Sequence, residues 1–219
     1  MNQQKRIKIL FLLKKKYGLK KKTDLIFSSP FECLISVVLS AQARDTVVNR
    51  ITKNLFSIAN NPVKMLSLGE KGIKNIIRKI GLFRKKSKNI YKICKILLEK
   101  YNSIVPNNRR ELELLPGVGR KTSNVVLNII FKKKKIAVDT HVYRVCQRTA
   151  FACGKNVIEV ERLLLKYVPE KFKIYVHHWF IFHGKNTCKA RNMKCNNCII
   201  NKFCEYYQYL AKEKFLKIF

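Results

Sequence analysis

The stretch Leu115-Pro116-Gly117-Val118-Gly119-Arg120-Lys121 combines a glycine-built turn with a lysine that follows it directly. Residues 109–114, which follow a helix-breaking Val105-Pro106-Asn107-Asn108 segment, are predicted to form a short helix, and residues 122–131 an apolar helix. The glycines therefore form a hairpin between two helices. Glycine lets a ligand approach the backbone closely, and the unpaired N–H groups that open the second helix lie at the positive end of its dipole. We expect an anion to bind here, although a Gly-x-Gly pair alone is equally typical of a plain turn.

Lys121 and Asp139 are the candidate catalytic residues. Lys121 falls in the first turn after the hairpin, where the positive helix end and partial burial both favour a neutral amine, and a neutral lysine can attack carbon. Asp139 stands in Val138-Asp139-Thr140-His141, at the start of another predicted helix. An aspartate at that place is ordinarily an N-cap, and the capping and catalytic roles are compatible.

The charge of the chain indicates a polyanionic partner. The 219 residues include 47 Lys and Arg against 13 Asp and Glu, a formal net charge of +34, and 47% are hydrophobic, which argues for a globular fold. This excess favours nucleic acid, although a compositional bias toward lysine explains part of it and the net charge does not locate the site. No apolar run approaches the roughly 20 residues that span a bilayer, so we expect no membrane partner.

Four of the eight cysteines predict a metal centre. Their spacing is C-x6-C-x2-C-x5-C, and the residues are Cys188, Cys195, Cys198 and Cys204. Iron–sulfur clusters and structural zinc both use four cysteines, so the spacing alone leaves the metal open, and disulfides are the less favoured alternative. A reducing cytosol fits this cysteine usage. The remaining cysteines are expected to be buried small hydrophobic residues: Cys33, Cys94, Cys146 and Cys153.

The loop between the first two of these cysteines is basic. It carries Lys189, Arg191 and Lys194, which a metal-tied loop would hold toward phosphate. Solvated surface is the alternative interpretation.

Most of the chain has helical periodicity, and the fold class is predicted to be all-α. Apart from the two helices of the hairpin, predicted helices cover residues 3–17, 31–39, 45–55, 62–68, 71–80, 90–101, 142–148, 157–167 and 172–183. No strand pair is evident. Residues 136–138 are predicted to be a short extended link, and the charged run Lys132–Lys135 before them is predicted to connect two lobes.

These features together resemble the helix-hairpin-helix DNA glycosylase/AP lyase family with a [4Fe-4S] cluster. The resemblance covers nearly the whole chain. Its motifs are Ser28-Ser29-Pro30-Phe31, Leu39-Ser40-Ala41-Gln42-Ala43, the hairpin Leu115–Lys121, the segment Ala137–His141, His177-His178-Trp179 and the four cysteines.

The resemblance implies a two-lobed fold. Residues 23–133 are expected to form a six-helix barrel domain that contains the helix-hairpin-helix motif at about 108–128. Residues 1–22 together with 134–219 are expected to form a helical domain with a C-terminal [4Fe-4S] cluster loop at 188–204.

The resemblance also implies residue roles. In this family the hairpin grips the DNA backbone, the lysine at the position of Lys121 attacks the sugar C1′ of a flipped nucleotide, and the aspartate at the position of Asp139 assists. Gln42 and Leu82 resemble the residues that enter the duplex where the damaged base leaves. The four cysteines would hold the cluster, and the further DNA contacts would come from Gly117, Val118, Gly119, Arg120 and His141 and from the basic loop.

The implied activity is that of a bifunctional base-excision-repair DNA glycosylase/AP lyase. It removes oxidised pyrimidines through a lysine Schiff base and cleaves the strand 3′ to the abasic site by β-elimination. The expected partner is double-stranded DNA that contains damaged pyrimidines or abasic sites, bound by a monomer in the cytoplasm and associated with the nucleoid. Two alternatives are a single-function glycosylase, which uses the aspartate with water and lacks this lysine, and a non-catalytic zinc-bearing nucleic-acid binder.

The sequence departs from the family pattern at three places. Arg44 stands where a small polar residue is common, and Lys132–Lys135 replaces a more neutral connection, which puts the details of the DNA contacts in doubt. The tail from Tyr206 to Phe219 is longer, and we assign it no role beyond packing or solubility.

Overall fold

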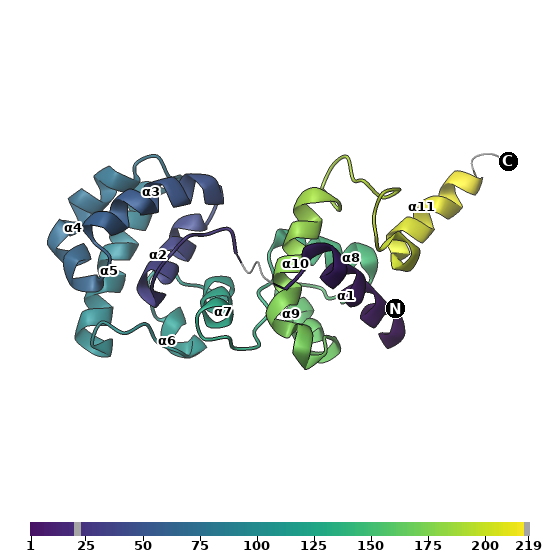
Figure 1. Ribbon diagram of the computed structural model, residues 1–219, viewed down its shortest axis with the longest axis horizontal. Coiled ribbons are helices and arrows are strands. Elements are labelled where there is room, and N and C mark those ends of the chain that lie inside the picture. The colour runs from purple at the N-terminus through teal and green to yellow at the C-terminus, as the bar shows by residue number, and fades with distance from the viewer. Residues whose placement is uncertain (20–22, 217–219) are drawn as a thin grey trace. The chain divides into compact units, whose positions relative to one another are not determined.

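The computed structural model describes residues 1–19 and 23–216, with side chains up to residue 211, and within these residues the fold is all-helical, as the sequence predicts. The chain divides into two compact units, Thr23–Lys133 and Met1–Lys22 with Lys134–Phe219. The first unit holds α2 (Pro30–Ser40), α3 (Asp45–Ile58), α4 (Pro62–Ile77), α5 (Phe83–Tyr101), α6 (Arg109–Glu113) and α7 (Arg120–Ile129) (Figure 1). The second unit holds α1 (Gln3–Tyr17), α8 (Thr140–Thr149), α9 (Val157–Tyr167), η1 (Glu170–Phe172), α10 (Lys173–Asn186), η2 (Asn201–Phe203) and α11 (Glu205–Leu216).

Capping residues explain where several helices begin. Ser29 accepts a hydrogen bond from the N–H of Glu32, the Glu32 carboxylate accepts one from the N–H of Ser28, and Pro30 occupies the first turn of α2. This reciprocal arrangement satisfies backbone donors that a helix start leaves unpaired. Asn61 caps α4 and Asn108 caps α6, each with its side-chain oxygen, which accepts one backbone hydrogen bond.

Helix α4 contains the break that the sequence predicts between residues 62–68 and 71–80. Gly69 has φ 71° and ψ 164°, far from helical values, so two helical segments meet there at a kink. An L-residue would be strained in this conformation, and glycine is therefore the residue that lets the chain turn. The second segment of α4 ends at Ile77, before the predicted end at residue 80.

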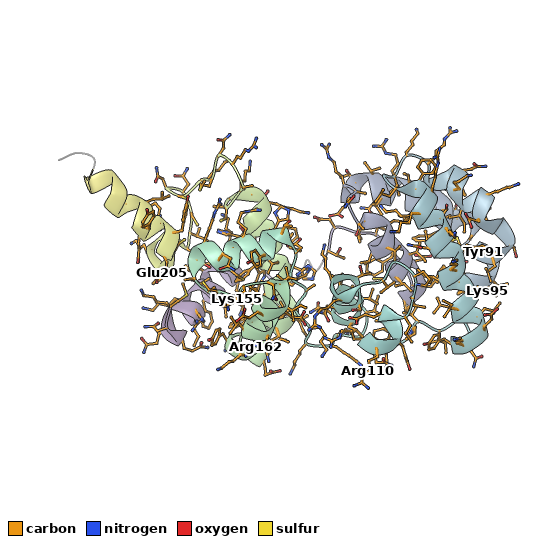
Figure 2. The ribbon with its side chains drawn as sticks, turned by 180° about the vertical axis from the view of Figure 1, so that it is seen from behind. Tyr91, Lys95, Arg110, Lys155, Arg162 and Glu205 are labelled. Carbon is orange, nitrogen blue, oxygen red and sulfur yellow. The ribbon has the colours of Figure 1, made fainter. Side chains whose placement is uncertain are left out.

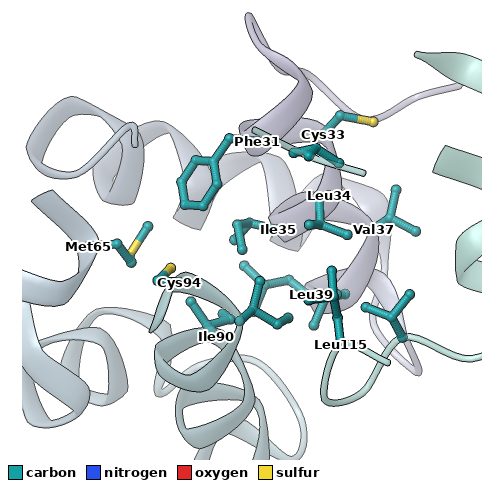
Figure 3. Packing of buried hydrophobic residues seen from close by; sticks show 14 of the residues in the cluster. Phe31, Cys33, Leu34, Ile35, Val37, Leu39, Met65, Ile90, Cys94 and Leu115 are labelled. Carbon is teal, nitrogen blue, oxygen red and sulfur yellow. The ribbon is translucent and has the colours of Figure 1, made fainter. Parts of the chain in front are cut away.

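Helix α2 is the centre of the first unit. Every residue from Phe31 to Leu39 is buried, and Figure 3 shows its side chains packed against Met65 of α4 and against Ile90 and Cys94 of α5. Leu115, at the start of the hairpin, joins the same cluster. The hairpin is thus anchored in the core of this unit by an apolar side chain.

The second unit has its own core, built around α8 and α10. Phe151 and Phe180 are both fully buried and meet edge to face, with ring centroids 5.2 Å apart. Gly184 of α10 lies so close to α8 that a Cβ at this position would stand 2.9 Å from the Cβ of His141. The absence of a side chain at Gly184 therefore lets α10 approach the start of α8.

Cysteine burial departs from the sequence prediction at one position. Cys33, Cys94 and Cys146 are buried, and burial raises the pKa of the Cys33 and Cys94 thiols to about 12, so they behave as apolar residues. Cys153 is exposed, because it follows the end of α8 on a surface loop. The prediction that it is buried is wrong.

No helix among residues 1–19 and 23–216 is long and apolar enough to cross a membrane. The basic side chains lie mainly on the surface. Figure 2 labels four of them, Lys95, Arg110, Lys155 and Arg162, and each is exposed on its unit.

Candidate active site and cysteine pocket

The hairpin between α6 and α7 has the geometry expected of an anion-binding turn. Gly117 has φ 79°, in the left-handed region that favours glycine, and Gly119 is the N-cap of α7 without a side chain to cover the helix end. Among the described residues, the backbone N–H groups of Gly119 and Lys121 have no backbone acceptor. They lie at the positive end of the α7 dipole, so a phosphate can bind there.

Val118 contributes to the hairpin in a different way. Its side chain is buried and its N–H donates to the carbonyl of Leu115 at 3.0 Å. Ser123 of α7 donates to the Glu113 carboxylate of α6 at 3.1 Å and thereby ties the two helices together. Val118 thus anchors the turn, while the N–H groups of Gly119 and Lys121 beside it can bind a ligand.

Lys121 lies in the first turn of α7, where the sequence places it, and it is exposed. The predicted partial burial is therefore not found. An exposed amine on a helix N-terminus is accessible to a large substrate. Arg120, its neighbour, is half-buried.

Gln42 and Leu82 share an unusual backbone conformation in the first unit. Both are exposed, with Leu82 57% accessible, and their φ angles are 56° and 59°. Left-handed backbone is uncommon for residues other than glycine and tends to occur at functional sites. Gly81 lies beside Gln42, since a Cβ on Gly81 would stand 3.8 Å from the Gln42 carbonyl oxygen. The two turns are therefore neighbours.

Lys86 is a residue of this region that the sequence analysis missed. Its side chain is buried, and its Nζ donates to the carbonyl oxygens of Leu39 at 2.9 Å and Ala41 at 2.6 Å. Burial lowers the pKa of this ammonium group. The sequence does contain a sign of this burial, because Lys86 lies four residues before Ile90 and therefore on the apolar face of α5. A lysine on a buried face needs hydrogen-bond acceptors there.

Asp139 caps α8 in the second unit. Its Oδ1 accepts a hydrogen bond from the N–H of Val142 at 2.8 Å, and the side chain is half-buried. The extended segment before it is held by His177, whose Nδ1 donates to the carbonyl of Ala137 at 2.6 Å. The sequence prediction of a cap is confirmed, and the cap uses only one of the two carboxylate oxygens.

His141 follows Asp139 on the first turn of α8. Its Nδ1 accepts a hydrogen bond from Arg144 at 3.1 Å, and the same guanidinium donates to the carbonyl oxygens of Gly184 and Cys188. Arg144 therefore links the start of α8 to the first of the four clustered cysteines.

The four predicted ligand cysteines come together. All of them line one pocket, together with His183, Arg148 and Tyr206 among others. Within the described residues, no three His, Cys, Asp or Glu side chains form a group that could hold a metal ion. Burial, with the repulsion of neighbouring thiolates added, raises the pKa of Cys198 to about 11. A metal centre that bound these side chains would have to displace the thiol protons, because the thiolate is the ligand.

Two groups lie within hydrogen-bonding distance of the sulfur atoms. Arg148 lies 3.6 Å from the sulfur of Cys188 and His183 lies 3.5 Å from the sulfur of Cys198. Burial lowers the pKa of His183 to about 4, so its ring is neutral at pH 7. Hydrogen bonds to ligating sulfur are a common feature of iron–sulfur sites.

The basic loop between the first two cysteines is fixed at its base and exposed at its tip. The Arg148 guanidinium donates to the carbonyl oxygens of Lys189 at 2.6 Å and Ala190 at 3.2 Å, and the N–H of Lys194 donates to Thr187 at 3.0 Å. The loop side chains Lys189, Arg191 and Lys194 are all exposed. The loop can thus present positive charge from a fixed position.

Comparison with known proteins shows the family of this chain. The family model for the HhH-GPD superfamily base excision DNA repair proteins matches residues 35–170. The chain belongs to this superfamily.

Individual relatives narrow the comparison to one type of enzyme. The chain is 57% identical to Endonuclease III of Buchnera aphidicola subsp. Acyrthosiphon pisum over 95% of this chain and 99% of that protein. It is 55% identical to Endonuclease III of Escherichia coli K12, over 94% of this chain and 97% of that protein. Its fold matches a structure of a trapped covalent intermediate of endonuclease III with DNA, with a TM-score of 0.90, 39% identity and coverage of 96% of this chain and 99% of that chain.

Proposed function

We propose that this protein is a bifunctional DNA glycosylase and AP lyase that removes oxidised pyrimidines from duplex DNA and then nicks the strand. The observation that carries the proposal is an accessible lysine, Lys121, in the first turn of a helix that opens on a glycine hairpin. The covalent character of the related trapped endonuclease III–DNA complex supports it. The protein acts on damaged or abasic double-stranded DNA as a monomer associated with the nucleoid.

DNA is held through its backbone. The hairpin Gly117–Arg120, with the N–H groups of Gly119 and Lys121, takes one phosphate region, and the exposed side chains of Lys189, Arg191 and Lys194 take another. His141, held by Arg144, adds a contact from the start of α8.

Gln42 and Leu82 act where the damaged base leaves the duplex. A base inside a duplex is out of reach and must be extruded at a cost of a few kcal/mol, which is lowest for poorly stacked bases. The exposed side chains of these two residues fill the gap and slow the return of the base.

Lys121 supplies the nucleophile and Asp139 the carboxylate. Asp139 accepts the proton that the Lys121 ammonium must lose and stabilises positive charge on the sugar. The Lys121 nitrogen bonds to C1′ as the bond from C1′ to the base breaks, and the base leaves with a proton. The sugar ring then opens to an iminium ion, a C2′ proton is lost, and the bond from C3′ to its phosphate oxygen breaks. Hydrolysis of the iminium frees the lysine.

The donors of the cysteine pocket match those of a [4Fe-4S] cluster in kind and number, although no three described side chains are close enough together to hold a single metal ion. Cys188, Cys195, Cys198 and Cys204, which line one pocket, would be the four ligands. Arg148 donates toward the sulfur of Cys188, and the His183 ring lies beside the sulfur of Cys198. When bound, the cluster supplies a covalent clip that holds the basic loop in place. Arg148 also holds the loop, because its guanidinium donates to the carbonyl oxygens of Lys189 and Ala190.

Reductive trapping tests the function. Borohydride should trap the wild-type protein on an oligonucleotide duplex that carries one oxidised pyrimidine, and the Lys121→Ala variant should give no adduct. Lys64→Ala is a matched control, since Lys64 is also exposed in the first turn of a helix, α4, and it should be trapped like the wild type. Base release without any adduct in the wild type would favour a single-function glycosylase. Colourless, zinc-loaded protein that binds DNA but neither releases a base nor nicks the strand would favour the non-catalytic binder.

A further inference from the structure

The two turns that carry Gln42 and Leu82 meet at a buried lysine. Lys86 is 5% exposed, and its ammonium group lies between the C-terminal end of α2 and the first turn of α5. Its Nζ donates to the carbonyl oxygens of Leu39 at 2.9 Å and of Ala41 at 2.6 Å. A buried charge of this kind is tolerated because it is hydrogen-bonded and sits at the negative end of a helix dipole.

These two carbonyl groups belong to the turn that Gln42 follows. The last carbonyls of a helix have no partner within the helix. In α2 the carbonyl of Val37 accepts from the Ser40 hydroxyl and that of Ser40 accepts from the N–H of Ala43, while those of Leu39 and Ala41 accept from Lys86. Lys86 thus holds the backbone on the N-terminal side of Gln42, which stands in the left-handed conformation.

The same lysine is fixed to the turn of Leu82. The N–H of Lys86 donates to the carbonyl of Leu82 at 3.0 Å, so Lys86 closes the first turn of α5, of which Leu82 is the N-cap. Gly81 lies against the carbonyl of Gln42, as described above. One residue therefore connects, through its main chain and its side chain, the two left-handed turns.

We propose that Lys86 is a positioning residue for base extrusion: its side chain sets Gln42 relative to Leu82, so that both enter the duplex together. This inference rests on the proposed function, because it assigns a role to Lys86 through these two residues. Lys86 itself is too deeply buried to contact the substrate. Its loss should affect the opening of a duplex and leave the chemistry at Lys121 intact.

The test compares Lys86→Met and Lys86→Gln with the wild type on two substrates. The methionine has a similar length without a donor, and the glutamine retains an N–H donor group without the charge. A duplex with one oxidised pyrimidine, and 2-aminopurine beside it to report unstacking, requires extrusion. A single-stranded oligonucleotide with one abasic site requires only the lysine chemistry. Borohydride trapping on that second substrate also reports whether each variant is folded.

The expected result is a selective loss. Lys86→Met should lower kcat/KM on the duplex by roughly 10- to 100-fold, the scale of a misplacement of about 1 Å, and should reduce the 2-aminopurine signal. Trapping on the single strand should stay within about threefold of the wild type, because the position of Lys121 does not change in the variant. Lys86→Gln should show the same selectivity to a smaller extent, and it decides the test if the methionine variant does not fold.

A second comparison isolates the route through Gln42. In a Gln42→Ala background, Lys86→Met should add much less than it does in the wild type, because residues that act as a unit are non-additive. Equal losses on duplex and single strand, no loss on either, or full additivity would each overturn the proposal. Failure of the wild type to be trapped on either substrate would instead refute the proposed function.

Discussion

At the residue scale, Asp139 combines a structural and a chemical role in one carboxylate. Its Oδ1 caps α8 through the N–H of Val142, and His177 holds the preceding segment through Ala137. A side chain fixed by a cap has little rotamer freedom left. The same bond that starts the helix therefore orients the group that we assign to proton transfer.

The two roles of Asp139 can be separated by two substitutions. Asparagine is as good an N-cap as aspartate but cannot take a proton, so Asp139→Asn should retain stability and lower the rate of base release by roughly 10²- to 10⁴-fold. Asp139→Ala should lose the rate and also about 1 kcal/mol of stability. Urea unfolding and single-turnover cleavage of lesion-bearing duplex measure the two effects. Normal cleavage by the asparagine variant would contradict the proton-transfer role.

At the element scale, the helix-hairpin-helix motif depends on what lies beneath its turn. Gly117 has φ 79°, and a Cβ on it would stand 2.4 Å from the side-chain nitrogen of Asn89 on α5. Gly119, two residues later, has φ −94° and nothing within 4 Å of an added Cβ. Backbone conformation and close packing therefore both require glycine at position 117, whereas neither requires it at position 119.

We expect Gly117→Ala to be the more damaging change in the hairpin. Left-handed backbone costs a residue with a Cβ about 1–2 kcal/mol, and Asn89 must move as well. Gly119→Ala should cost less than about 1 kcal/mol, because only the capping preference is affected. Thermal unfolding gives the stability and titration with undamaged duplex gives the affinity, which should fall more for Gly117→Ala. Equal effects of the two substitutions would mean that the close contact of Gly117 with Asn89 on α5 does not matter.

At the scale of the whole molecule, the two units divide the functional residues between them. Lys121, Gln42, Leu82 and the hairpin belong to the unit Thr23–Lys133, while Asp139, His141 and the four cysteines belong to the other. The charged connection is tied on both sides, since Lys133 donates to the carbonyl of Asn107 and Lys134 lies 2.9 Å from the Glu170 carboxylate. Each unit has a core of its own.

Removal of the cluster should therefore disturb the units unequally. Oxidation and chelation of the iron-loaded protein should increase hydrogen exchange in residues 187–204 and in α8, because Arg144 and Arg148 of α8 bind that loop. Helix α2, in the core of the other unit, should exchange as before. Mass-spectrometric hydrogen exchange measures both regions in one sample. A loss of protection in α2 as large as that in α8 would show that the cluster stabilises the whole chain.

Much of this protein follows from local sequence. The helices, the hairpin and the cap at Asp139 were predictable because 3.6-residue periodicity, glycine and side-chain caps act within a few residues. The four cysteines were predictable as a group, since their spacing is short. Helix α11 was not among the predicted helices.

The tertiary structure alone decided which distant groups meet. The sequence could not show that Lys86 is buried on the carbonyls of Leu39 and Ala41, that Lys121 is exposed, or that Arg148 holds the basic loop. Burial and hydrogen bonding between segments some 40 residues apart depend on how the helices pack. That packing is set by the sum of many weak apolar contacts, whereas a helix start is set by one or two neighbouring side chains.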